Sequence, residues 1–176
     1  MSSILKVDQL KDSGGNAIIT SDGAGNLTAG TIPAKTIGTG AVLQVKHYSD
    51  NSSTATTSTV YQSTGVSIDI TPSSTSNKIL IIASATIYAA SATGEPHITI
   101  FRDSTDLATN ANGGFSDTFN NAGAILDNTT IHFVDSPNTT SQITYEIKLR
   151  RDTTGSTQYG ANDVMRTMTC MEIAGW

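Results

Sequence analysis

The side chains that could carry chemistry are few and widely spaced in this chain. Its 3 histidines are His47, His97 and His132, and each lies inside or beside a predicted strand. Three imidazoles can bind a metal ion, but the spacing contains no His-x-His pair and no calcium-loop pattern of carboxylates. The pattern therefore favours histidines on strand surfaces, and it predicts no metal ion and no cofactor.

Carboxylates are the second group that could do chemistry, because glycoside cleavage needs two carboxyl groups at a fixed separation in a sugar-binding cleft. Asp103 and Asp106 flank a predicted turn, and Asp8 and Asp12 lie near the N-terminus. The single tryptophan, Trp176, offers little surface on which sugars can stack. We interpret these carboxylates as solvated turn residues, so a polysaccharide depolymerase is the less favoured hypothesis.

No nucleophile or nucleotide-binding motif accompanies these residues. The single cysteine, Cys170, lies in an apolar run and is predicted to be a buried, inert thiol. Residues 22–26 lack the ligand spacing of an EF-hand and the Gly-Lys-Ser/Thr ending of a phosphate-binding loop, so they are predicted to form a turn. A Gly-x-Ser-x-Gly elbow is also missing from the sequence. We therefore expect no catalytic residues and a protein that is not an enzyme.

Composition and charge limit the classes of partner. Charged residues make up 14% of the 176 residues, compared with about 25% in ordinary soluble domains, and Ser and Thr take the polar positions instead. The net charge of −5 argues against a nucleic-acid partner, which would need a basic patch. No run approaches the roughly 18 apolar residues of a membrane-spanning helix, and no signal-peptide pattern is apparent. We expect synthesis in the cytoplasm and no membrane insertion.

The elements that must position these residues are predicted strands, because apolar and polar side chains alternate through most of the chain. The alternation is clearest at residues 143–150 and 66–71, and residues 98–100 indicate a third strand. Residues 79–82 and 168–173 carry apolar side chains on both faces of a predicted strand. The first is predicted to be a central strand, and the second a buried strand or a bulge. Without a convincing amphipathic helix, the pattern predicts an all-β fold: an antiparallel β-sandwich, jelly-roll-like.

Two segments fit this pattern less well. The hydroxyl-rich tract at residues 52–59 would suit a linker or a polar edge strand, and the edge strand is favoured. Residues 110–123 are rich in Asn and Gly, which indicates a long loop. Phe115 and Phe119 are predicted to hold this loop against the core or against a neighbouring subunit.

Residues 1–40 are predicted to form an extended N-terminal arm, and residues 41–176 the sandwich domain. The arm contains the hairpin-type dipeptide Asp22-Gly23 between two short apolar stretches. One helical turn is the alternative for its first part, because apolar residues recur at every third position from Ile4 to Leu10. Glycines follow so closely that a strand or an irregular segment is favoured.

The arm has too few apolar residues to form a core of its own. These residues are therefore predicted to contact other chains of an assembly. The predicted anchors are Ile4, Leu5, Val7, Leu10, Ile18 and Ile19.

Several segments resemble small structural proteins of tailed phages, notably marine and cyanobacterial ones. The strongest resemblance lies in residues 66–80, and the other segments are residues 4–10, 18–27, 40–45 and 171–175. The resemblance implies a virion component, made in the host cytoplasm and exposed on the particle. It also implies a C-terminal β-sandwich, a homotrimer, and attachment through the N-terminal arm.

The function expected from these features is that of a short tail-fibre or adhesin-like protein. Its arm would bind the baseplate or tail, and its sandwich would face a host surface glycan or protein. The alternative is a capsid decoration (cement) protein whose arm lies along the lattice of the major capsid protein; the missing fibre shaft favours this version. A lectin-like monomer unrelated to virions is a further hypothesis. A trimer is expected because strands that are apolar on both faces need more cover than one thin sandwich supplies.

Overall fold

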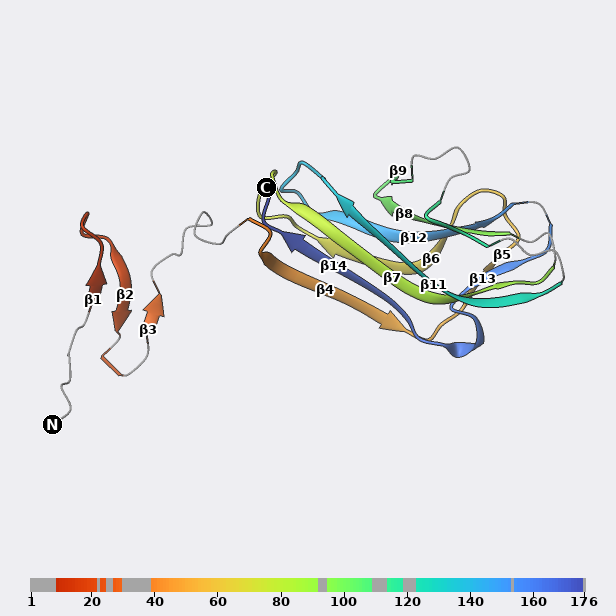
Figure 1. The fold of residues 1–176 in the computed structure, drawn as a ribbon, viewed down its shortest axis with the longest axis horizontal. Helices are drawn as coiled ribbons and strands as arrows, with labels where there is room; N and C mark the ends of the chain where they lie inside the picture. Colours follow the sequence, from red (N-terminus) through yellow and green to blue (C-terminus); the bar gives the residue numbers. More distant parts are fainter. Residues whose placement is uncertain are drawn as a thin grey trace. The chain divides into compact units, whose positions relative to one another are not determined.

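The computed structural model describes residues 9–21, 23–24, 27–29, 39–91, 95–108, 114–118, 123–152 and 154–175. The chain divides into two compact units, Met1–Ala41 and Val42–Trp176 (Figure 1). Strands dominate the described residues of both units, and the 3₁₀ turn η2 (Ala161–Asp163) is the helical element found among them. None of the described residues forms a helix long and apolar enough to cross a membrane.

The first unit contains a three-stranded antiparallel sheet. Its strands are β1 (Gln9–Lys11), β2 (Ala17–Ser21) and β3 (Leu27–Ala29). The turn between β1 and β2 is closed by Asp12, whose Oδ1 accepts hydrogen bonds from the backbone nitrogens of Gly14 and Asn16, each at 2.9 Å. The pairing of β2 with β3 confirms the predicted hairpin.

Leu10 lies in strand β1, so the strand interpretation of this part of the arm is confirmed. Gly23, between β2 and β3, has a φ of 77°, a left-handed conformation that glycine adopts without steric cost. Of the residues on which the helical alternative rested, Ile4 and Val7 lie outside the described residues.

The second unit contains two sheets. Its strands are β4 (Val42–Asp50), β5 (Thr54–Thr56), β6 (Gln62–Ile70), β7 (Lys78–Ala89), β8 (Pro96–Arg102), β9 (Thr105–Asp106), β10 (Ser116–Asp117), β11 (Ile125–Asp135), β12 (Ile143–Arg151), β13 (Thr157–Tyr159) and β14 (Arg166–Ile173). The larger sheet has the order β4-β14-β7-β13-β5, and β11 pairs with the other edge of β7. The smaller sheet has the order β10-β8-β12-β6, with β9 beside β8.

Nested antiparallel pairs define the topology of this unit. Strand β4 pairs with β14, β6 with β12, β7 with β11, and β8 with β10. The chain of this unit therefore folds as one long hairpin. Its successive strand pairs lie alternately in the larger and the smaller sheet. This winding is that of a jelly roll, so the predicted jelly-roll-like antiparallel β-sandwich is confirmed.

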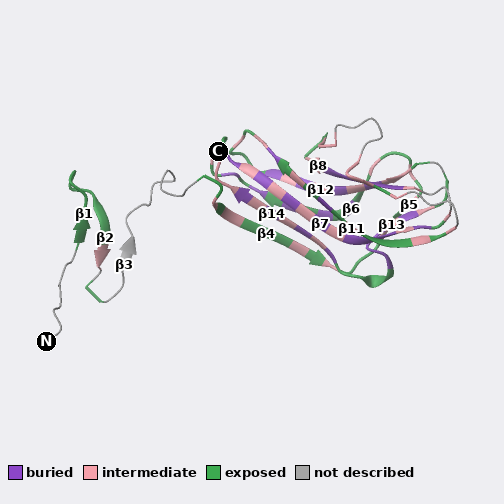
Figure 2. Ribbon diagram, in the orientation of Figure 1, coloured by how far each residue is buried: buried purple, intermediate pink, exposed green. Residues whose placement is uncertain are grey.

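The core lies between the two sheets and is made mainly of alternate residues of β6, β7, β8, β12 and β14 (Figure 2). Its largest aliphatic side chains, all fully buried, are Ile70, Ile79, Ile81, Ile87, Ile98, Ile100, Ile147 and Leu149. Because successive side chains of a strand point to opposite faces, one sequence pattern supplies both the core and the outer surface. The strands predicted from alternation at β6, β8 and β12 are confirmed.

The two runs predicted to be apolar and buried on both faces, residues 79–82 and 168–173, lie in β7 and β14. Strand β7 is central, as expected, because it has neighbours on both edges. However, only one face of β7 and β14 is buried: Ile81 and Cys170 face the core, whereas Leu80 and Met171 lie on the outer face and are half-buried. The second apolar face is therefore a surface of the single chain.

The two uncertain segments are partly strand. In the hydroxyl-rich tract, only the short edge strand β5 forms, so the edge-strand prediction is confirmed for Thr54–Thr56 alone. A loop throughout residues 110–123 is wrong, because Ser116 and Asp117 form β10 beside β8. Phe115 packs against the core, as predicted, with its ring centroid 5.1 Å from that of Phe133. Phe119 and Trp176 lie outside the described residues.

Candidate functional site

The arm sheet exposes apolar side chains on both of its faces. Leu10 is 53% exposed, Ile18 48% and Ile19 37%. Leu10 and Ile19 are cross-strand partners and share one face, while Ile18 lies on the other. Two strands alone are at best marginally stable in water, and a sheet of three strands depends on its apolar face for stability. Of the other predicted anchors, Ile4, Leu5 and Val7 lie outside the described residues.

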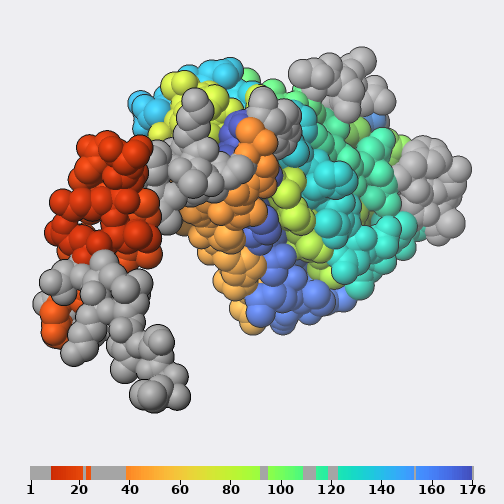
Figure 3. Space-filling model, turned by 60° about the vertical axis from the view of Figure 1, so that its left-hand side comes forward, coloured from red at the N-terminus to blue at the C-terminus, as the bar shows by residue number. Residues whose placement is uncertain are grey.

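A second apolar surface crosses the outer face of the larger sheet. The strand registers place Val45, Met171, Leu80 and Val134 side by side on β4, β14, β7 and β11. We call these residues the apolar row. Figure 3 shows this face, with β4, β14, β7 and β11 next to one another in orange, blue, yellow-green and teal. Val45 is 54% and Val134 43% exposed, so water contacts both ends of the row.

The neighbouring row on the same face is more polar. It consists of His47, Thr169, Ile82 and His132. A ring nitrogen of His47 lies 2.9 Å from Thr169 Oγ1. His47 and His132 are exposed, so the prediction of strand-surface histidines is confirmed for these two.

That prediction is wrong for His97, which is only 4% exposed in β8. Its side chain points to the opposite face from the core residues Ile98 and Ile100, and β8 pairs with both β9 and β10. Thr99, which points the same way, donates a hydrogen bond to Asp106 of β9 and is fully buried. The fold thus buries a histidine that the local pattern placed on the surface.

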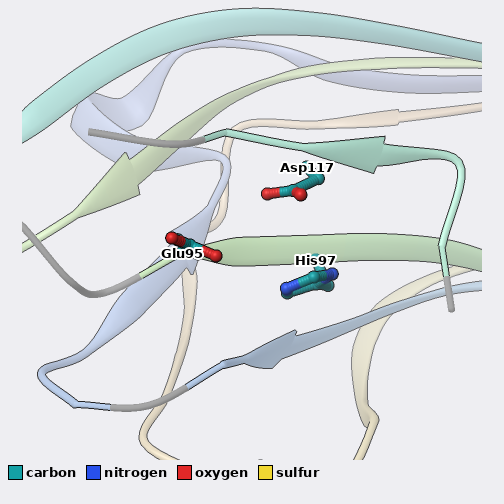
Figure 4. Close-up of side chains that lie close together, drawn as sticks. All are labelled: Glu95, His97 and Asp117. Carbon is teal, nitrogen blue, oxygen red and sulfur yellow. The ribbon is translucent and has the colours of Figure 1, made fainter. Parts of the chain in front are cut away.

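His97 lies in a cluster with two carboxylates, Glu95 and Asp117 (Figure 4). One ligand atom from each side chain lies within 4.8 Å of the other two. Glu95 and His97 are separated by one residue of extended chain, so they point to the same side, and Asp117 is the cross-strand partner of His97. We call these three residues the Glu95 cluster.

The Glu95 cluster was missed in the sequence for an identifiable reason. Glu95-x-His97 has the spacing that places two ligands on one face of a strand, but this mixed pair is neither a His-x-His pair nor a calcium-loop pattern of carboxylates. Asp117 is joined to the other two residues by the pairing of β10 with β8. That pairing is a long-range contact which no local pattern predicts.

The carboxylates that were considered for glycoside cleavage have other roles. Asp12 and Asp103 lie in turns, which confirms their interpretation as turn residues. Asp103 Oδ1 accepts a hydrogen bond from the Thr144 backbone nitrogen at 3.0 Å. Asp106 lies in strand β9 rather than in a turn. Asp8 lies outside the described residues.

Cys170 is free and buried, as predicted. Burial raises the pKa of its thiol to about 12, because a thiolate would be poorly solvated in the core. A thiol of this kind is a structural core residue.

Comparisons with known proteins do not identify a family. No protein-family model and no curated protein sequence matches the chain. The chain is similar in part to solved structures of infectious bursal disease virus. The match to the Gt strain has a TM-score of 0.39 and 13% sequence identity, and covers 76% of this chain and 39% of that one. The match to the Gx strain has a TM-score of 0.38 and 14% identity, with coverage of 77% and 43%. The chain thus spans about two fifths of these viral chains.

Proposed function

We propose that this chain is a non-enzymatic structural protein of a tailed-phage virion, which binds other virion proteins through its N-terminal arm. The observation that carries the proposal is the arm sheet, in which Leu10, Ile18 and Ile19 are all exposed. Exposed apolar groups on an element without a core mark a surface that another protein covers.

The arm binds the baseplate or tail, or else the lattice of the major capsid protein. In both cases the partner supplies the second layer that the three-stranded sheet lacks. Leu10 and Ile19 offer one face and Ile18 the other, so the sheet is suited to insertion between two surfaces. Burial of each such side chain contributes about 1.5–3 kcal/mol, which makes a small arm an effective anchor.

The sandwich domains associate as a homotrimer. The apolar row supports this step, because it places adjacent apolar side chains on the outer face of the larger sheet. The row crosses the whole width of β4, β14, β7 and β11 and is therefore broad enough to pack against a second copy.

Within the virion, the leading proposal is a short tail-fibre or adhesin-like protein whose sandwich faces a host surface glycan or protein. Decoration of the capsid is the alternative. Jelly rolls occur in viral capsid proteins and in lectins, so the fold is compatible with both roles and specifies neither.

Copy number separates these two roles. Quantitative mass spectrometry of purified virions is expected to find few copies for a tail protein and hundreds for a decoration protein. Labelled antibody seen by electron microscopy then locates the protein on the tail or over the head. Its absence from purified particles would contradict both roles.

The contribution of the arm is tested by the variant that combines Leu10→Asp and Ile18→Asp. We expect this variant to fold, as judged by circular dichroism, and to be lost from particles assembled in its presence. The matched control is Val60→Asp, at a loop position that is 69% exposed between β5 and β6. Equal incorporation of the two variants would contradict attachment through the arm.

A further inference from the structure

We propose that the Glu95 cluster is a binding site for a divalent transition-metal ion, with Zn²⁺ as its preferred occupant. The ligands are a carboxylate oxygen of Glu95, a ring nitrogen of His97 and a carboxylate oxygen of Asp117. All three converge to within 4.8 Å before any ion is bound. This site is independent of the assembly function proposed above.

The backbone holds the three ligands on one side of the smaller sheet. Glu95 and His97 are fixed relative to each other by the extended chain at the start of β8, and the ladder between β8 and β10 sets Asp117 opposite His97. In Figure 4, Glu95 and His97 come from the β8 region and Asp117 from the neighbouring strand. Bonds from Zn²⁺ to nitrogen and oxygen are about 2.0–2.2 Å long. Small rotations of the three side chains are therefore sufficient to enclose one ion.

The charges around the cluster favour a cation. Two carboxylates placed this close repel each other, and among the described residues neither Glu95 nor Asp117 has a side-chain hydrogen bond or an ion pair. The nearest cationic group by register is Arg150 of β12, the cross-strand partner of His97. Its Nη1 lies 3.5 Å from Asp152 Oδ1, and its guanidinium lies 5.3 Å from the centre of the Tyr61 ring.

Arg150 and Asp117 also affect the pKa of the Tyr61 hydroxyl. Burial is the largest cause of the raised pKa of its hydroxyl; the hydrogen bond and charge of Arg150 lower that pKa, and the carboxylates of Asp106 and Asp117 raise it. Arg150 thus lies close to both Tyr61 and Asp152.

The donor set decides which ion fits. Mg²⁺ and Ca²⁺ prefer oxygen ligands throughout, whereas one imidazole with two carboxylates suits Zn²⁺ or Mn²⁺. Zn²⁺ accepts four ligands in a tetrahedron, so three protein ligands leave one position for water. His97 is nine-tenths buried and Asp117 exposed, so the ion reaches the site from the side of Asp117.

An ion at this position would join β10 to the sheet. Strand β10 has two residues and pairs with β8, so it is held by few backbone hydrogen bonds. A metal ion that bridges Asp117 to His97 and Glu95 fastens this strand to β8. Because the ion binds the folded chain and not the unfolded one, it raises the midpoint of thermal unfolding.

The test is calorimetric titration of the chelator-treated full chain with ZnCl₂, and separately with MnCl₂ and CaCl₂. We expect one Zn²⁺ per chain, weaker binding of Mn²⁺, and no saturable binding of Ca²⁺. Loss of a residue that merely supports a metal ligand costs about 10–100-fold in affinity, so Asp117→Asn and Glu95→Gln are expected to weaken Zn²⁺ binding by at least that factor. Both variants are also expected to lose the rise in melting temperature that Zn²⁺ produces.

Two controls separate this site from adventitious binding. Asp127→Asn alters an exposed carboxylate of β11 and is expected to bind Zn²⁺ normally. The double variant His47→Gln, His132→Gln removes the exposed histidines and is also expected to bind normally. Zn²⁺ binding that persists in Asp117→Asn and Glu95→Gln, or that disappears in the histidine double variant, would overturn the proposal. So would the absence of saturable binding to the unaltered chain.

Discussion

The carboxylate of Glu172 and the amide nitrogen of Asn77 lie 2.6 Å apart, which joins the loop before β7 to the final strand, β14. The same oxygen, Oε1, accepts hydrogen bonds from the backbone nitrogen and the hydroxyl of Ser73, and Oε2 accepts one from Gln44. Asn77 Oδ1 in turn accepts a hydrogen bond from the Gly175 nitrogen. Burial raises the pKa of Glu172, but the hydrogen bonds outweigh it, so the net pKa is lowered. A fully buried negative charge is therefore stabilised at one end of the sandwich.

The first prediction is that Glu172→Gln destabilises the fold. The new side chain has one accepting oxygen instead of two, and its amide nitrogen cannot accept hydrogen bonds, so at least one donor around it loses its acceptor. We expect a loss of about 2–3 kcal/mol in the free energy of unfolding, which corresponds to a melting temperature lower by roughly 4–12 °C. Calorimetry or urea titration measures it. The control is Glu146→Gln, whose partly exposed ion pair with Lys148 contributes less than about 1 kcal/mol; equal losses in the two variants would contradict the prediction.

The second prediction concerns the stability of the fold at low pH. A hydrogen bond from Arg166 is the main reason why the pKa of Asp50 lies well below its ordinary value of 3.8, and burial opposes this shift. Because the folded-state pKa is the lower one, the pair stabilises the fold fully above the unfolded-state pKa. Its contribution is lost as the pH falls below about 5 and on through the folded-state pKa. Asp50→Asn should therefore be less stable than the unaltered chain at pH 7, by a margin that shrinks towards pH 2. Urea titrations across this range test it, and a constant margin would rule out the assigned linkage.

The third prediction compares two glycines with nearly the same positive φ. Gly160 has φ 79° and Gly65 φ 80°. Alanine at either position is strained by the positive φ, which costs about 1–2 kcal/mol. At Gly160 the added Cβ would also overlap the carbonyl oxygen of Ser52, whereas at Gly65 its nearest neighbour is Arg166 Nη2 at 3.9 Å. Gly160→Ala is expected to lose about 1–3 kcal/mol more than Gly65→Ala, as measured by thermal unfolding. The reverse order would show that the turn at Gly160 relaxes easily.

The fourth prediction tests the apolar row as a contact between copies of the chain. Val45→Lys places a charge at one end of the row, and loss of one buried valine weakens association by about ten-fold or more. Sedimentation velocity at micromolar concentration is expected to show a trimer for the unaltered chain and smaller species for this variant. Val60→Lys, at an exposed loop position, serves as the control and should sediment like the unaltered chain. A monomer for the unaltered chain would remove the trimer from the proposed function.

The fifth prediction concerns the thiol of Cys170. With its pKa raised to about 12 by burial, the thiolate fraction at pH 8 is roughly a thousand-fold below that of a free cysteine. We expect no reaction with a disulfide reagent in the native protein and complete reaction in guanidinium chloride. Absorbance of the released thiol measures both rates. A fast native reaction would place Cys170 at the surface instead.

The fold was predicted mainly from the alternation of apolar and polar side chains along the strands. In β12, Ile143, Tyr145 and Ile147 alternate with polar residues, and all three are buried. The pattern is local, because the pleat of a strand sends successive side chains to opposite faces. It therefore identified the core side of the strands and the all-β class without knowledge of their neighbours.

Alternation did not predict what covers the other face. The pattern treats Leu80 like Ile79, yet Ile79 is fully buried and Leu80 lies on the outer face. Equally, nothing near His97 in the sequence indicates that it is buried, or that Asp117 lies beside it. Glu172 is polar in a strand read as apolar, and its partners Asn77 and Gln44 are remote in sequence.

By itself, then, the sequence determined the class of the fold, the inward side of its main strands, the buried thiol and the hairpin of the arm, since each depends on residues near one another in the chain. Only the tertiary structure decided the jelly-roll pairing, the apolar row, the Glu95 cluster and the buried charge of Glu172. These depend on which strands lie side by side and in which register. A shift of one residue in a register moves every side chain to the opposite face, so such contacts exist only once the whole sandwich has formed.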